Sequence, residues 1–179
     1  MGEKAAGILE AKMDRAVFVP GGEAGQGGGE PILFKIVLVP LDGSPKAEQI
    51  LMHVKALQRA FHSEVILLRV VTPAPSLLGR SEILLLSRPD PADREAERAE
   101  AYLNALRIRL GAGFRPVRTL CLAGDPAACI LRAAERVQAD LIAMAIGARA
   151  GLARRWSAGV AGAVLMRAEM PVLLVPSPG

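Results

Sequence analysis

The sequence predicts a single α/β domain built on a parallel sheet with helices on both faces. Short apolar runs rich in branched side chains alternate with longer segments in which apolar residues recur every three or four positions. Helix-start pairs such as Ser44-Pro45 and Asp125-Pro126 separate the two patterns. The chain has 179 residues, of which 51% are hydrophobic, and its mean hydropathy is +0.32. This composition suits one packed core and excludes a wholly disordered chain.

The first strand and helix are expected at the start of the domain. The run ILFKIVLV at 32–39 is short, apolar and branched, which is typical of a strand covered on both faces. Ser44 suits a helix N-cap and Pro45 the first helical position. Behind them lies one helical stripe, made of Ala47, Ile50, Leu51, Val54, Leu57 and Phe61.

The same alternation continues to the end of the chain. We expect strands over 64–71, 116–123, 140–146 and 170–175. We expect helices that open at Asp90-Pro91 and close at Gly111, that open at Asp125-Pro126, and that run from about 157 to 168. Strands and helices in this order form βαβ units, whose right-handed crossovers make the sheet parallel.

Residues 1–31 form a segment of different composition. The stretch 16–20 reads AVFVP and is strand-like, and 21–31 reads GGEAGQGGGEP, the composition of a flexible linker. The domain organisation is therefore an N-terminal segment and linker over 1–31 and one domain over 32–179.

Charge and composition exclude several classes of partner. The formal net charge is +4, but the cations are spread along the chain, and aromatic residues make up only 3% of it, too few for base-stacking platforms. No nucleic-acid partner is expected. No apolar stretch approaches the ~20 residues needed to span a bilayer, and no signal peptide is evident, so we expect a cytoplasmic protein without membrane insertion.

The cysteines and histidines suggest no metal or redox site. Cys121 and Cys129 fit no C-x-x-C pattern, and we expect them to be buried and reduced. His53 and His62 lack a set of metal-ligand partners.

Function in a parallel sheet is expected in the loops after the strands, where the strand order reverses. Here these are the loops at 40–44, 71–75 and 147–158. The third contains glycines and Arg149, Arg154 and Arg155, and it leads into a helix N-terminus, an arrangement that favours an anion.

Four segments, read together, resemble the universal stress protein family. They are KIVLVPLDGS at 35–44, VILLRVV at 65–71, LAGDPAACI at 122–130, and DLIAMAIGARAGLARRWSAGVAGAVLMRAEMPVLLVP at 140–176. The resemblance implies a flavodoxin-like, doubly wound, three-layer domain with a five-stranded parallel sheet in the order 3-2-1-4-5.

The phosphate loop of the nucleotide-binding members reads G-x2-G-x9-G-[S/T]. The corresponding positions here are Ala145, Ala148, Ala158 and Gly159, so all three glycines are alanine and the hydroxyl is missing. A Cβ where glycine has positive φ costs about 1 kcal/mol or more, and it also occupies space needed by a phosphate oxygen. The lost hydroxyl removes a hydrogen bond worth roughly 1.5–3 kcal/mol.

The residues at the positions that contact adenosine in the family match the family pattern better than the phosphate loop does. The resemblance places Asp42 at the adenine-contacting acid, with Pro40 before it and Val70 beside the base. The alternatives are helix capping or an Asx-turn in DGSP for Asp42, and strand-end and core roles for Pro40 and Val70. The arginines of the loop could also bind phosphate in place of backbone amides. The resulting vestigial or weak nucleotide site comprises Pro40, Asp42, Val70, Ala145, Ala148, Arg149, Ala158, Gly159 and Val160.

We expect a stress-response module that is not an enzyme and has no tightly bound cofactor. The sequence contains neither G-x-S-x-G nor G-x-x-x-x-G-K-[ST]. The alternative is an ATP- or AMP-binding switch or slow ATPase, and a third hypothesis is a regulatory domain that docks on a transporter or kinase.

The last strand is the expected protein contact. The run MPVLLVP at 170–176, from Met170 to Pro176, is apolar throughout and would lie at a sheet edge that must be paired or covered. The resemblance implies a homodimer through this strand, besides an unknown protein partner. The alternative is that the chain's own 16–20 covers the edge.

Overall fold

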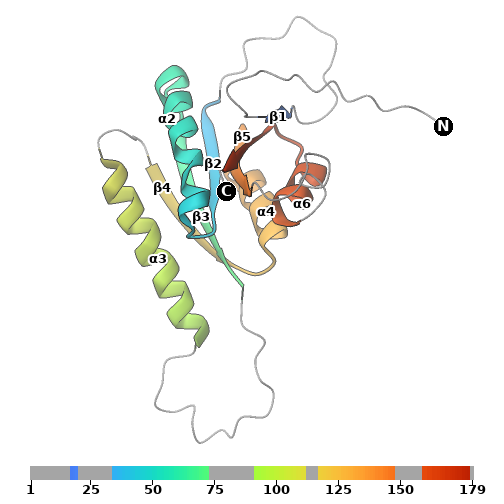
Figure 1. The fold of residues 1–179 in the computed structure, drawn as a ribbon. Coiled ribbons are helices and arrows are strands. Elements are labelled where there is room, and N and C mark those ends of the chain that lie inside the picture. Colours follow the sequence, from blue (N-terminus) through green and yellow to red (C-terminus); the bar gives the residue numbers. More distant parts are fainter. Residues whose placement is uncertain (1–16, 20–33, 73–90, 112–116, 148–158, 178–179) are drawn as a thin grey trace, which may run out of the picture.

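The fold is centred on one sheet, shown in Figure 1 from a computed structural model that describes residues 17–19, 34–72, 91–111, 117–147 and 159–177. The strand order is β1-β6-β5-β2-β3-β4. The strands are β1 (Val17–Val19), β2 (Ile36–Leu41), β3 (Glu64–Val71), β4 (Val117–Ala123), β5 (Leu141–Gly147) and β6 (Val172–Ser177). The helices are α1 (Pro45–Glu48), α2 (Ile50–Phe61), α3 (Pro91–Leu110), α4 (Pro126–Val137) and α6 (Gly159–Arg167).

The five strands after β1 are all parallel to one another. Counted from β2, their order is 3-2-1-4-5, so the predicted fold class and topology are confirmed.

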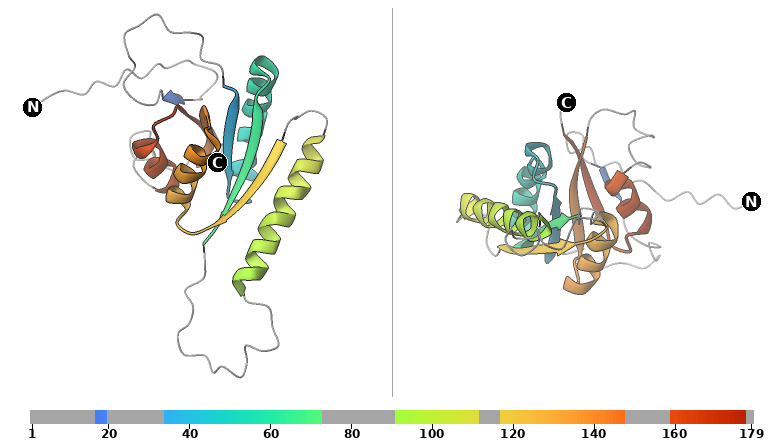
Figure 2. Two further views of the ribbon diagram at one scale, coloured as in Figure 1. Left: turned by 180° about the vertical axis from the view of Figure 1, so that it is seen from behind. Right: turned by 90° about the horizontal axis from the view of Figure 1, so that it is seen from below.

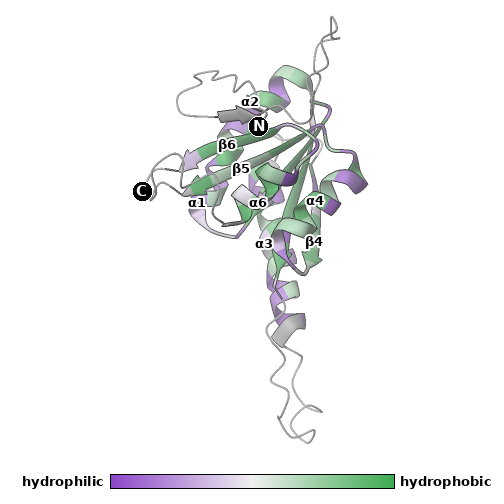
Figure 3. Ribbon diagram, turned by 90° about the vertical axis from the view of Figure 1, so that its right-hand side faces the viewer, coloured by the Kyte–Doolittle hydropathy of each residue, from purple (hydrophilic) through white to green (hydrophobic). Residues whose placement is uncertain are grey.

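Helices cover both faces of this sheet (Figure 2). One core forms under α2 and α3, with Val39, Leu67 and Leu103 among its fully buried side chains. The other forms under α4 and α6 around Leu38 and Ile142. Neighbouring residues of one strand therefore enter different cores, which is why the strands are apolar at consecutive positions; Figure 3 shows this as green ribbon along β5 and β6.

Local capping chemistry sets the helix starts where the sequence predicts them. The Ser44 hydroxyl accepts a hydrogen bond from the Ala47 amide at 3.1 Å, and the Asp125 carboxylate accepts one from the Ala128 amide at 2.8 Å. The predicted single helix, which starts at Pro45 and carries its apolar stripe to Phe61, is interrupted at Gln49, which separates α1 from α2.

Two predicted strand boundaries are wrong by a few residues. The first strand begins at Ile36, where the amide is bonded to the Asp140 carboxylate at 2.8 Å, and it continues through Pro40 and Leu41. The last strand runs to Ser177, because β5 pairs with β6 as far as Gly147 with Ser177. The expectation of two buried thiols holds for Cys129, whereas Cys121 is only half-buried; both are free.

The strand at Val17–Val19 adds to the outer edge of β6. It pairs antiparallel, with Val17 opposite Leu174 and Val19 opposite Val172. The alternative in which the chain's own N-terminal segment covers this edge is therefore observed in the structure.

Candidate functional site

A crevice opens where β2 and β5 part. Their paired residues are Val37 with Leu141 and Leu38 with Ile142, and the pairing ends there although both strands continue. Because this is also where the strand order reverses, the crevice lies at the topological switch point of the sheet. Pro40 fits at this place because a proline has no amide to give to a ladder.

The crevice contains a cavity of about 450 Å³. Its walls come from the carboxyl ends of β2, β3 and β5, from the first turns of α4 and α6, and from Glu95 of α3. Elements far apart in the sequence therefore build one site.

The structure brings five of the predicted site residues together around this cavity: Pro40, Asp42, Val70, Ala145 and Val160. Gly159 begins α6 beside Val160. Ala148, Arg149 and Ala158 lie outside the described residues, as do Arg154, Arg155 and Trp156.

Asp42 already has a structural role. One of its carboxylate oxygens accepts a hydrogen bond from the Ser44 amide at 2.8 Å. This is the Asx-turn that the DGSP sequence favours, and it holds the loop in position for the α1 N-cap. The side chain is otherwise exposed at the cavity wall, which leaves its second oxygen available to a ligand.

Arg69 is a cavity residue that sequence reasoning missed. It lies near the end of β3 opposite Leu41, and its guanidinium donates a long hydrogen bond, 3.4 Å, to the Leu41 carbonyl. The same guanidinium lies against Gly43, whose φ of +82° suits glycine. The one signal in the sequence is that Arg69 is the only charged residue between Glu64 and the end of an otherwise apolar strand.

The charges of the described lining residues do not favour a polyphosphate. Among the described lining residues, Asp42 and Glu95 are carboxylates and Arg69 is the one cation. Two carboxylates against one guanidinium give this part of the wall a formal charge of −1, which repels phosphate.

Two positions of the expected phosphate loop can be judged directly. Ala145 lies within β5, opposite Val175, and lines the cavity at a position where the resemblance places a glycine of the related loop. Gly159 has a φ of +80°, so a serine or threonine at this position would be strained even though open space surrounds it. The backbone conformation at Gly159 therefore favours glycine over the serine or threonine that would supply the missing hydroxyl.

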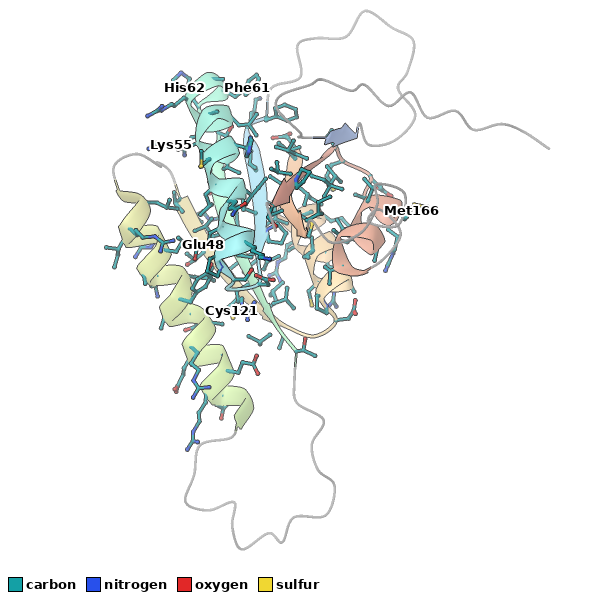
Figure 4. All side chains as sticks on the ribbon, viewed as in Figure 1. Glu48, Lys55, Phe61, His62, Cys121 and Met166 are labelled. Carbon is teal, nitrogen blue, oxygen red and sulfur yellow. The ribbon has the colours of Figure 1, made fainter. Side chains whose placement is uncertain are left out.

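A polar contact holds α3, which carries Glu95, against α1. The Tyr102 hydroxyl donates to the Glu48 carboxylate at 3.1 Å, and Arg109 forms an ion pair with the same carboxylate. Burial, followed by the Glu48 charge, raises the pKa of Tyr102 far above its ordinary value, so this phenol stays a donor. Figure 4 shows Glu48 on the side of α1 that faces α3.

The described ranges contain no group of three His, Cys, Asp or Glu side chains placed to hold a metal ion. In the same ranges, no helix is long and apolar enough to cross a membrane.

Comparison with known proteins places this geometry in a family. The family model described as "Universal stress protein family" matches residues 33–176. The universal stress protein MJ0531 of Methanocaldococcus jannaschii is 30% identical over 148 residues, which are 82% of this chain and 84% of that protein.

Solved structures have the same fold. A universal stress protein family member from Burkholderia pseudomallei superposes with a TM-score of 0.61 at 25% identity, over 83% of this chain and all of that one. A universal stress protein in complex with cAMP superposes with a TM-score of 0.61 at 19% identity, over 82% and 99% of the two chains. The chain therefore belongs to the universal stress protein family.

Proposed function

We propose that this chain is a stress-response module that acts through protein contacts and binds ATP too weakly to retain it. The observation that carries the proposal is the set of alanines at 145, 148 and 158, the positions at which the resemblance expects the glycines of the phosphate loop. The two carboxylates at the cavity wall add to it, because they oppose the charge of a triphosphate.

Calorimetry with ATP tests the nucleotide part of this proposal. We expect no binding heat for the wild-type protein and no adenine nucleotide released when it is denatured. Replacing Ala145, Ala148 and Ala158 together by glycine should produce measurable binding, because three positions for phosphate approach are restored.

The matched control replaces three exposed helical alanines by glycine, at Ala60, Ala101 and Ala105. This variant should remain unable to bind ATP. Tight ATP binding by the wild-type protein, or nucleotide released on its denaturation, would overturn the proposal.

The protein contact that we propose is a homodimer through the outer edge of β6. β6 carries no charged side chain, and such an edge favours strand pairing. β1 occupies this edge within the chain, so the dimer requires β1 to leave it.

Light scattering tests this contact, because a homodimer has twice the mass of the single chain. The dimer should weaken when Leu173→Lys introduces a charge into β6. A monomeric mass that Leu173→Lys leaves unchanged at all concentrations would contradict the dimer.

A second candidate function is a switch that binds a nucleotide with few phosphates. The 450 Å³ cavity, with Asp42 and Val70 at its wall, favours it. One structural relative was solved with cAMP, whose single phosphodiester brings less negative charge than ATP. On this hypothesis cAMP or AMP binds the wild-type protein more tightly than ATP does, and phosphate release from ATP would instead favour the slow ATPase.

A further inference from the structure

The sheet has a second edge, at β4, which no other described element covers on one face or along its outer side. β4 pairs with β3 and is the last strand on that side of the sheet in the described structure. α3 packs along one face of β4, as Figure 2 shows, whereas α4 packs over β2 and β3. A cavity of about 770 Å³ lies between α4 and β4, and we call it the β4 groove.

The floor of the β4 groove is apolar. Leu120 and Leu122 lie opposite Leu68 and Val70 of β3 and are only partly buried. Ala133 and Val137 of α4 complete the floor. Half-exposed leucines on a sheet face are typical of a surface that gains from being covered.

The rim of the β4 groove is basic. Arg118 of β4 and Arg132 and Arg136 of α4 line it, and no carboxylate is among its described lining residues. Arg118 contacts Glu64 at 3.1 Å, but its side chain remains 65% exposed. Arg132 donates to the Cys129 sulfur at 3.4 Å, and Arg136 is exposed. An occupant of the groove must therefore be acidic.

The outer side of β4 also presents backbone amides and carbonyls that the sheet does not use. An extended peptide can satisfy them by adding a strand, while alternate side chains enter the groove. The opposite edge of the same sheet already accepts a strand in this way, since β1 adds to β6.

We propose that the β4 groove binds an acidic, extended segment of a partner protein, whose backbone pairs with β4 and whose carboxylates contact the three arginines. A second copy of this chain is a poor occupant, because pairing β4 with β4 would bring two sets of these arginines together. The inference rests on the proposed function only in that both invoke a protein contact. It involves neither nucleotide nor the β6 edge, so either proposal can fail alone.

A synthetic probe tests the pairing and the charge separately. The probe is a fluorescein-labelled nine-residue peptide of alternating valine and glutamate, with lysine replacing glutamate in one control and alternate backbone amides N-methylated in another. Fluorescence anisotropy should detect the glutamate peptide and neither control. Hydrogen exchange of the amides at 117–123 should slow when the glutamate peptide is bound.

Charge reversal on the protein locates the site. Arg132→Glu with Arg136→Glu should weaken binding of the glutamate peptide at least about tenfold. The control, Arg59→Glu with Arg167→Glu, makes the same charge change on exposed helix ends elsewhere and should leave affinity within about twofold. Circular dichroism checks that both variants are folded.

Each other outcome overturns the proposal. These are an absence of binding by the glutamate peptide, equal binding of the lysine or N-methylated peptide, or unchanged exchange at 117–123. Equal binding of a thymidine oligonucleotide, or displacement of the peptide by millimolar inorganic phosphate, would instead assign the arginines to simple anion binding.

Discussion

The two edges of the sheet differ in sequence and in how they are completed. β6 reads VLLVPS, has no charged residue, and is paired along its outer side by β1. β4 reads VRTLCLA, carries Arg118 and the exposed Thr119, and has no second strand in the described structure. An apolar edge invites any strand, whereas a charged edge rejects most of them. Among the described residues, the permissive edge is therefore covered by a strand, whereas the selective edge has none.

The largest effect is expected from removing the cover of β6. A chain that begins at Ile32 lacks β1, so nothing has to leave the edge of β6 before it pairs with a second copy, and the dimer should form at lower concentration than that of the full chain. Light scattering over a range of concentrations measures this. Removing only residues 1–12 keeps β1 and should leave the mass as in the full chain; a monomer in both cases would break the comparison.

A smaller effect is expected on the free energy of unfolding when one leucine near each edge is shortened. Leu174→Ala removes a side chain that is 1% exposed in β6, and it should cost about 2–5 kcal/mol. Leu120→Ala removes a partly exposed side chain from β4 and should cost about 1 kcal/mol, because less apolar area is lost from the interior. Urea unfolding compares the two, and equal losses would mean that the β4 groove is not open.

Making β4 resemble β6 should produce a modest gain in self-association. Arg118→Val with Thr119→Val removes the charge and the exposed polar group from the edge, so concentration-dependent scattering should rise several-fold. Arg59→Val on α2 is the control for the loss of an exposed arginine. If both variants scatter alike, edge charge is not what keeps β4 unpaired.

The smallest effect concerns the other face of β4, which α3 covers. Burial, with a further contribution from Glu100, raises the pKa of the Cys121 thiol. Since the thiolate is the reactive form, alkylation of Cys121 should reach its half-maximal rate at a higher pH than a free cysteine does. Glu100→Gln should lower that pH; a Cys129→Ala background makes Cys121, labelled in Figure 4, the single thiol.

Local chemistry explains what could be predicted from the sequence. Helix starts at Ser44 and Asp125 follow from side chains that bond amides three residues away, and these contacts need nothing distant. The order of the strands follows from a resemblance that spans the whole domain. Asp42 could be a ligand contact or a local structural residue. The Asx-turn that it forms is also a local contact, between residues two positions apart.

Long-range packing explains what the sequence did not reveal. Glu95 lies in a helix of mixed charges, and it lines the site because the contacts of Tyr102 and Arg109 with Glu48 hold α3 against α1. Arg69 enters the site through its register with β2. The β4 groove was missed because it depends on how far α4 extends over the sheet, which no local pattern records.

The pairing of β1 with β6 also fixes an order in time. A ribosome makes Val17 long before its partner Leu174, because the other strands of the sheet lie between them in the sequence. The rest of the sheet contains strands whose partners are closer in the chain, and contacts with long sequence separation form late. β1 can therefore pair only after β6 has been made, and a chain cut short anywhere before β6 leaves β1 without a partner strand.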